Sequence, residues 1–397
     1  MHVVLVGDYP RDPGHIGGGV EAHVLYLSQA LQDYPDLKLD VVTLDKWGLE
    51  QRTVNHKKVT VHYVPFALLP SRLSVLGNIR RMRVEISRLK PDLVHAHVAG
   101  AYAEAAAQTG LPWVLTLHGI RFLEARLRPG LLNRYRGWVV AKEELRSVKQ
   151  ARHVISINPF IPLTFNGHIS GQVYDIKNPV YEPFFHVTGQ SQPGRTLFAG
   201  RLIPRKGVHT LLRAFAELHR RMPEATLRLA GGDASAHAPT PYYQDLKQFV
   251  ADAGLEKAVT FLGEVSQATL LEEYAACSAL VLSSVLETAP MVITQAMAAG
   301  RAVISTDAGG ARYMVEHGQT GLIVPCNDEQ ALGEAMLQLL SNETRLREMG
   351  RCARVVAERC SHPSVVAAQT RAAYYHILGQ VPPQVNVPNS LALGKEA

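Results

Sequence analysis

The sequence predicts an α/β protein built from two tandem, doubly wound Rossmann-like domains that face a cleft. Three observations lead to this fold class. The chain has 397 residues, which is too many for one ordinary core and suits two domains. Short apolar runs rich in β-branched residues alternate with helical patterns along the chain, as in parallel sheets covered on both faces. The alternation pauses once, in a stretch rich in Pro, Gly and Ser over residues 178–195.

The first domain is expected over residues 1–178. HVVLVG (2–7) is predicted as its first strand, and residues 20–32 carry apolar residues at helical spacing. The further predicted strands are LDVVTL, VTVHYVP, DLVHAHV, WVLTLHG and HVISIN. Residues 179–195 are assigned to a linker.

The second domain is expected over residues 196–360. Its predicted strands are TLFAGR, ATLRLAGGD, AVTFLGEV, ALVLSS, AVISTD and GLIVP, with helices between most of them. The predicted helix HTLLRAFAELHRRM shows apolar residues on one face, at Leu211, Leu212, Phe215 and Leu218. A last helix over 361–378 is expected to pack back on the first domain, and the Pro-containing tail 379–397 is expected to be disordered.

Composition excludes several classes of protein. Apolar residues make up 47% of the chain and charged residues 19%, which is typical of a globular protein. No apolar run reaches the roughly 18–20 residues of a spanning helix, and the N-terminus lacks the pattern of a signal peptide. The four cysteines form no CxxC pair, which favours a reduced, cytoplasmic protein over a disulfide framework or a cysteine zinc site.

Positive charge is concentrated in the first half of the chain. Residues 1–178 hold 22 Lys and Arg against 15 Asp and Glu, while the remainder holds 19 against 20. The excess gathers in 71–90 and 120–152. Solvated helix faces account for any single residue, but the clustering predicts contact with an anionic membrane surface or a phosphate-bearing acceptor. Nucleic acid is not expected as a partner, because no nucleic-acid-binding motif accompanies the charge.

Two loops carry the pattern of phosphate-binding segments. GHIGGGVEAHV (14–24) follows the first strand and opens a helix, so Gly17, Gly18 and Gly19 allow close backbone approach to an anion; a simple tight turn is the alternative. GRLIPRKG (200–207) follows the first strand of the second domain. Arg201 and Lys206 in this loop can converge on one charged group, or can be ordinary surface charges.

The stretch ETAPMVITQ (287–295) joins a predicted strand to a predicted helix. The Glu287 carboxylate can accept hydrogen bonds from sugar hydroxyls, or it can be an acid favoured by the helix dipole. Residues 288–292 open the helix, so the backbone of Thr288, Ala289, Met291 and Val292 can hold a diphosphate, with Pro290 at an early helical position. Gln295 lies about two turns further and could reach a ribose hydroxyl.

Histidines follow two strands of the first domain. His95 and His97 lie on the same face of a predicted strand and resemble a pair of metal ligands. No third ligand is evident and no DxD motif occurs, so no metal site is expected. His118 stands at the carboxyl end of the next strand, either in the cleft or as a structural histidine.

These pieces together resemble the family-4 retaining glycosyltransferases, which have the GT-B fold. The resemblance spans about residues 2–378 and rests on GGVEAHV, LHG, GRLIPRKG, LAGGD and ETAPMVITQAMAAG…GG…TGLIVP in this order and spacing. It implies a cytoplasmic enzyme that transfers a sugar from a nucleotide-sugar donor to an acceptor hydroxyl with retention of configuration, without a metal or other cofactor.

The resemblance also assigns roles to residues. Arg201 and Lys206 match the pair that grips the donor diphosphate. Glu287 matches the first acid of the family's Glu-x7-Glu motif, which contacts the donor sugar. Gly19 matches a glycine beside the phosphates, and His118 matches a histidine near the donor sugar. Gly18, Gly232 and Val265 complete the expected donor-binding set.

Gln295 departs from the family pattern, because it stands where the second acid, a ribose contact, is expected. We expect altered affinity or nucleotide preference rather than lost activity. The acceptor is expected to be a glycan or a lipid-linked intermediate of envelope polysaccharide or glycolipid synthesis. A nucleotide-sugar epimerase, a phosphorylase of the same fold and a non-catalytic two-domain binding protein are the alternatives.

Overall fold

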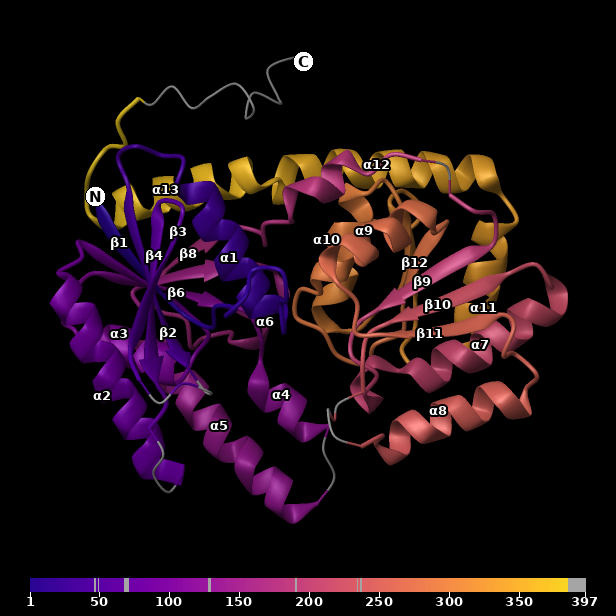
Figure 1. Ribbon diagram of the computed structural model, residues 1–397, viewed down its shortest axis with the longest axis horizontal. Coiled ribbons are helices and arrows are strands. Elements are labelled where there is room, and N and C mark those ends of the chain that lie inside the picture. The colour runs from indigo at the N-terminus through magenta and orange to yellow at the C-terminus, as the bar shows by residue number, and fades with distance from the viewer. Residues whose placement is uncertain are drawn as a thin grey trace. The chain divides into compact units, whose positions relative to one another are not determined.

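The computed structural model describes residues 1–45, 48, 50–67, 71–127, 130–189, 191–233, 235 and 238–384. The chain forms two compact units (Figure 1). Unit 1 comprises Met1–Pro179 and His362–Ala397, and unit 2 comprises Val180–Ser361. Within the described residues, no helix is both long enough and apolar enough to cross a membrane.

Unit 1 is built around one eight-stranded sheet. Its strands are β1 (His2–Val6), β2 (Lys38–Asp45), β3 (Arg52–His56), β4 (Val59–Pro65), β5 (Leu93–His97), β6 (Trp113–Leu117), β7 (His153–Ser156) and β8 (Gln172–Asp175). Its helices are α1 (Gly19–Leu31), α2 (Ser71–Leu89), α3 (Ala101–Ala107), α4 (Arg121–Arg126), α5 (Leu131–Gln150), α6 (Phe160–Thr164) and α13 (Pro363–Ile377).

The strand order of unit 1 is β3-β4-β2-β1-β5-β6-β7-β8. Every pairing is parallel except that of β3 with β4. The predicted parallel sheet is therefore correct for its centre and incomplete at both edges, because β3 and β8 were not predicted. The edge strand RTVNH is polar and mostly exposed, so it lacks the apolar run that signals a buried strand.

The helix α13 belongs to the fold of unit 1 although it lies at the other end of the chain. It packs against α1, and Figure 1 shows the two side by side. The Arg371 guanidinium and the Tyr375 hydroxyl both bond a carboxylate oxygen of Asp36, at 2.9 and 2.7 Å. Tyr374 is fully buried.

Unit 2 is built around a six-stranded, wholly parallel sheet. Its strands are β9 (Arg195–Ala199), β10 (Thr226–Ala230), β11 (Val259–Gly263), β12 (Ala279–Leu282), β13 (Ala302–Thr306) and β14 (Gly321–Val324). Its helices are α7 (Val208–Arg221), α8 (Pro241–Asp252), α9 (Gln267–Ala276), α10 (Met291–Ala298), α11 (Glu329–Leu340) and α12 (Glu343–Ser361), with short 3₁₀ turns η1 (Glu182–His186), η2 (Pro204–Lys206) and η3 (Gly309–Tyr313).

Two apolar clusters form the core of unit 2. One contains the buried face of α7, at Leu211, Leu212, Phe215 and Leu218, together with residues of α8 and α11. The other contains residues of η1, α9 and α10. The apolar face expected for residues 209–222 is therefore confirmed as the face that packs on the core.

The predicted linker is part of unit 2. The unit begins at Val180, and Val180, Phe184 and Phe185 are buried in its second core cluster. Gly and Pro signal a break in regular structure, but the Phe pair within the stretch indicates packing. Of the predicted tail, residues 385–397 lie outside the described residues.

Candidate functional site

The predicted site residues of unit 2 follow the carboxyl ends of its parallel strands. The strand order is β11-β10-β9-β12-β13-β14, so the order reverses direction between β9 and β12. Ligands of doubly wound sheets bind at such a switch point, because the loops after the two central strands diverge there. The loop of Arg201 and Lys206 follows β9, and Glu287 follows β12.

Lys206 and Glu287 meet in a charged cluster at this switch point. The Lys206 ammonium lies 2.5 Å from Oε1 of Glu287. The Ser284 hydroxyl donates to the same oxygen at 2.7 Å. The Arg205 guanidinium lies 3.5 Å from Oε2. The structure thus joins two segments that lie about eighty positions apart in the chain.

Glu287 is 7% exposed and remains a charged acceptor. Burial acts to raise the pKa of this carboxyl, but the charges of Lys206 and Arg205 and the hydrogen bonds from Lys206 and Ser284 outweigh it, so the pKa lies below its ordinary value. Oε1 already accepts two hydrogen bonds, whereas Oε2 has, among the described residues, the longer contact with Arg205. A carboxylate offers about four lone-pair sites, so Oε2 can accept from a ligand hydroxyl.

Gly207 fixes the direction in which the β9 loop leaves Lys206. Its φ is +63°, and a Cβ at this position would lie 2.0 Å from the Ser283 carbonyl oxygen. Only glycine fits such a left-handed residue in backbone contact with a neighbouring loop. The Ser283 hydroxyl also donates to the Lys206 carbonyl at 2.9 Å, so the two loops hold each other in register.

The helix α10 presents its N-terminus at the same edge of the sheet. It begins at Met291, with Pro290 in the N-cap position rather than inside the first turn. Among the described residues, the backbone N–H groups of Met291 and Val292 have no intramolecular acceptor. Thr288 and Ala289 precede the helix, and the Glu287 carbonyl accepts from the Gly310 N–H at 2.8 Å. N–H groups without an intrahelical acceptor and the helix dipole favour an anion here.

Gln295 lies on α10 and is 8% exposed. The buried Tyr274 hydroxyl is 3.4 Å from its Oε1 and 3.0 Å from the Val292 carbonyl. A glutamate at this position would bring a carboxylate next to the same hydroxyl.

The other predicted contacts of unit 2 lie in neighbouring loops. Arg201 is exposed and has no ion pair with any residue that the structure describes. Gly232 follows β10, and its carbonyl accepts from the Leu202 N–H at 2.9 Å. Val265 follows β11 and packs against the second core cluster. These residues follow strands of the same sheet as Lys206.

In unit 1, the predicted residues occupy the corresponding positions on the other sheet. Gly18 is the N-cap of α1 and Gly19 its first residue, and both are exposed. His118 follows β6, and its Nε2 lies 3.0 Å from Nδ1 of His97, the last residue of β5. Burial lowers the pKa of His118 well below its ordinary value.

Three residues of the site were not predicted from the sequence: Arg205, Ser284 and Tyr274. Arg205 could have been included, because it stands beside Lys206 in a loop already identified as functional. The hydrogen bonds of Ser284 and Tyr274 depend on the fold and carry no local signal.

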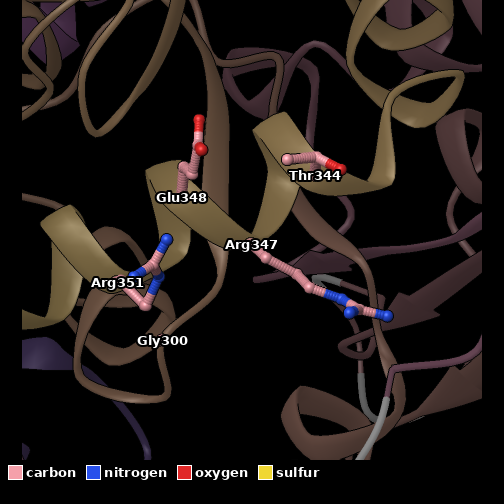
Figure 2. Close-up of a pocket in the computed structure, with 5 residues that line it drawn as sticks. All are labelled: Gly300, Thr344, Arg347, Glu348 and Arg351. Carbon is pink, nitrogen blue, oxygen red and sulfur yellow. The ribbon is translucent and has the colours of Figure 1, made fainter.

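A surface hollow of about 420 Å³ lies away from this cluster, beside α12 (Figure 2). It is lined by Gly300, Thr344, Arg347, Glu348 and Arg351. None of the predicted site residues lines it.

Comparison with known proteins identifies the family. Residues 184–356 match the model of the glycosyl transferases group 1, and residues 17–161 match that of Glycosyltransferase Family 4. The chain belongs to the group 1 glycosyltransferases. It is 28% identical to a D-inositol 3-phosphate glycosyltransferase of Pseudarthrobacter chlorophenolicus over 391 residues, which cover 90% of each chain. It is 26% identical to an uncharacterised glycosyltransferase of Methanocaldococcus jannaschii, over 84% of this chain and 88% of that protein.

Solved structures show the same fold for this group 1 glycosyltransferase. The sucrose-phosphate synthase of Thermosynechococcus elongatus has a TM-score of 0.79 at 22% identity, covering 95% of this chain and 99% of that one. Anabaena HepE in complex with UDP and glucose has a TM-score of 0.72 at 20% identity, covering 95% and 100%. The predicted GT-B fold and the predicted glycosyltransferase family are thereby confirmed. The retention of configuration stays a prediction.

Proposed function

We propose that this glycosyltransferase transfers a hexose from a uridine diphosphate sugar to an acceptor hydroxyl with retention of anomeric configuration and without a metal ion. The observation that carries the proposal is the cluster of Lys206, Arg205 and Glu287 at the switch point of unit 2, next to the N-terminus of α10. A donor of this type is supported by HepE, whose structures contain UDP and UDP-glucose.

The cluster suits the charge that develops during transfer. Negative charge grows on the departing diphosphate, and Lys206, Arg201 and the N–H groups of α10 would stabilise it as a fixed electrostatic environment. Glu287 would hold Lys206 in place through Oε1 and accept a donor-sugar hydroxyl through Oε2. His118 of unit 1 would contact the donor sugar, and Gly18 and Gly19 would admit the phosphates.

Retention would follow from a front-face route. The departing diphosphate itself would accept the proton of the acceptor hydroxyl, so no separate base is needed. This matches a site whose one buried carboxylate already holds two cations, because such a carboxylate is a weak base.

A donor screen tests the proposal. Purified protein is mixed with UDP-, GDP-, ADP- and dTDP-sugars, with and without EDTA, and thermal shift and mass spectrometry are recorded. We expect one UDP-sugar to raise the melting temperature and to be hydrolysed slowly, with no effect of EDTA. NMR of a transferred sugar then reports its anomeric configuration. Loss of activity with EDTA, or an inverted product, would contradict the proposal.

Gln295 is expected to contact the donor ribose. Donor affinity is measured for the wild type, Gln295→Glu and Gln295→Ala by calorimetry. We expect Gln295→Ala to bind about tenfold more weakly, the cost of one lost hydrogen bond of about 1.4 kcal/mol. Equal affinity in all three proteins would remove the ribose role.

We also propose that unit 1 contacts an anionic membrane surface, where a lipid-linked acceptor would be found. Helix α5 exposes Leu131, Leu132 and Trp138 to solvent beside the exposed cations Arg134 and Arg136. Exposed apolar and aromatic side chains among cations are typical of surfaces that insert into a bilayer interface.

Sedimentation with vesicles tests this contact. We expect binding to phosphatidylglycerol vesicles at low salt and little binding to phosphatidylcholine. Trp138→Ser combined with Leu131→Ser should weaken binding, whereas Val355→Ser, an exposed apolar residue of α12 in unit 2, should not. Failure of the wild type to bind at low salt would exclude the contact.

A further inference from the structure

Three histidines of unit 1 come together at one edge of its sheet. His97 ends β5, His118 follows β6, and His23 lies on α1, the helix that follows β1. The strands β1, β5 and β6 are neighbours in the sheet. Because the carboxyl ends of parallel strands share an edge, the fold brings His23 and His118 to His97. His95, the other histidine of the HAH pattern, is not part of this cluster.

The spacing of these rings is close to that of a metal site. One nitrogen from each of the three side chains lies within 4.8 Å of one from each of the others. Nitrogens bound to one tetrahedral zinc ion at 2.0–2.1 Å lie about 3.3 Å apart. The hydrogen bond between Nδ1 of His97 and Nε2 of His118, at 3.0 Å, already brings two of these nitrogens to about this separation.

A hydrogen bond orients the ring of His23 as second-shell groups do in metal sites. Nδ1 of His23 bonds Oδ1 of Asn178 at 2.9 Å, which leaves the lone pair on Nε2. Nε2 of His97 is buried without a hydrogen-bond partner among the described residues. His95, by contrast, has both nitrogens in hydrogen bonds, with Tyr374 and Thr116, and its ring is tilted by 31° against that of His97, with centroids 4.0 Å apart.

We propose that His23, His97 and His118 form an inhibitory site for a divalent transition metal, with Zn²⁺ as the probe. Imidazole ligands select zinc, copper or nickel over magnesium and calcium. Inhibition rests on the proposed function, in which His118 contacts the donor sugar: a ligated His118 cannot make that contact. The metal at this site would inhibit the enzyme and would take no part in the proposed transfer, which needs no metal ion.

Binding is measured first, because it does not depend on any activity. The protein carries Cys352→Ser and Cys360→Ser so that thiols outside the core do not compete for zinc, and it is stripped of metal. We expect titration calorimetry to show one equivalent of Zn²⁺ and no heat with Mg²⁺. Co²⁺ should give the visible absorption of a nitrogen-ligated ion.

Variants then locate the site. His97→Gln and His23→Gln should each lower zinc affinity at least tenfold, while His186→Gln, at an exposed histidine of unit 2, should leave it unchanged. Thermal unfolding of each variant checks that it is folded; His23 lies on a helix and His97 inside the sheet, so the two substitutions perturb different elements. Equal affinity of the wild type and folded His23→Gln, or no stoichiometric binding, would overturn the site.

Inhibition is measured separately on the donor identified by the screen. We expect Zn²⁺ to lower the transfer rate, EDTA to restore it, and His23→Gln to raise the zinc concentration for half inhibition at least tenfold. Binding without inhibition would overturn the inhibitory role. Zinc binding in a protein inactive with every donor would refute the proposed function and leave the metal site standing.

Discussion

Lys206 is the residue on which the proposed chemistry depends most. We expect Lys206→Ala to lower kcat by about 10²–10³, the cost of removing one preorganised donor from a developing anion. The melting temperature should fall as well, because Glu287 then keeps only Arg205 and Ser284 as partners. Arg213→Ala, which removes an exposed cation of α7, is the control. Wild-type turnover in a folded Lys206→Ala protein would contradict the assignment.

Glu287 should make stability depend on pH. Its pKa is lower in the folded protein than the 4.5 of a free glutamate, so the charged form is favoured by folding. The stabilisation is fully present above pH 4.5 and is lost as the pH falls through the lower, folded value.

Glu287→Gln removes this ionisation and therefore tests whether folding lowers or raises the pKa of Glu287. Melting temperatures of the wild type and the variant are compared from pH 3 to pH 8. We expect the gap between them to be widest above about pH 5 and to shrink in more acidic buffer. A gap that widens as the pH falls would mean that the folded pKa is raised instead.

Residue patterns identified part of each cluster. Lys206 and Glu287 each stood after a strand, where parallel sheets collect functional groups, so they could be predicted from the sequence. Their mutual contact could not, because about eighty residues separate them. The histidine cluster shows the same limit: His97 and His118 were noticed, but His23 sits in an ordinary helical pattern and gains its place only when β1, β5 and β6 align.

At the scale of elements, the loops depend on glycines in positions that no other residue fits. We expect Gly207→Ala to destabilise unit 2 by several kcal/mol and to displace Lys206, because it adds the cost of a left-handed alanine to a clash with the Ser283 carbonyl. Gly254 has a similar φ of +66° with open space around it. Gly254→Ala should therefore cost only about 1–2 kcal/mol.

The unfolding free energy of both variants is measured with denaturant, and their rate of donor hydrolysis is measured separately. Gly254→Ala should keep wild-type hydrolysis, whereas Gly207→Ala should lose it together with stability. Equal unfolding free energies would show that the β9 loop relaxes around the added Cβ.

Elements with strong periodicity were predicted well, and edge elements were not. The strands at the centre of both sheets are mainly apolar and buried on both faces, and the sequence shows them directly. The edge strands β3 (RTVNH) and β8 (QVYD) mix polar and apolar residues without a clear pattern. Their pairing is determined by a neighbouring strand that is already in place.

At the scale of the molecule, each unit has its own core, and unit 1 is closed by the C-terminal helix. Tyr374 of α13 is fully buried, and its hydroxyl bonds Nδ1 of His95 at 2.7 Å, a contact that spans 279 positions of the chain. Composition predicted two domains, and the last helix was expected on the first one. Which residue would fill the space beside β5 could not be deduced, since α13 has apolar residues around much of its surface.

Tyr374→Ala should therefore destabilise unit 1 although it lies near the end of the chain. Losing a buried aromatic ring costs about 3–5 kcal/mol, whereas Tyr374→Phe loses only the hydrogen bond to His95, about 1 kcal/mol. Hydrogen exchange followed by mass spectrometry reports each unit separately. We expect Tyr374→Ala to exchange faster in β5 and β6 while β9 and β12 keep wild-type protection, and Tyr374→Phe to fall between the wild type and the alanine variant in β5. Equal acceleration in both sheets would mean that the two units unfold as one cooperative body, and α13 would then stabilise the whole chain rather than unit 1.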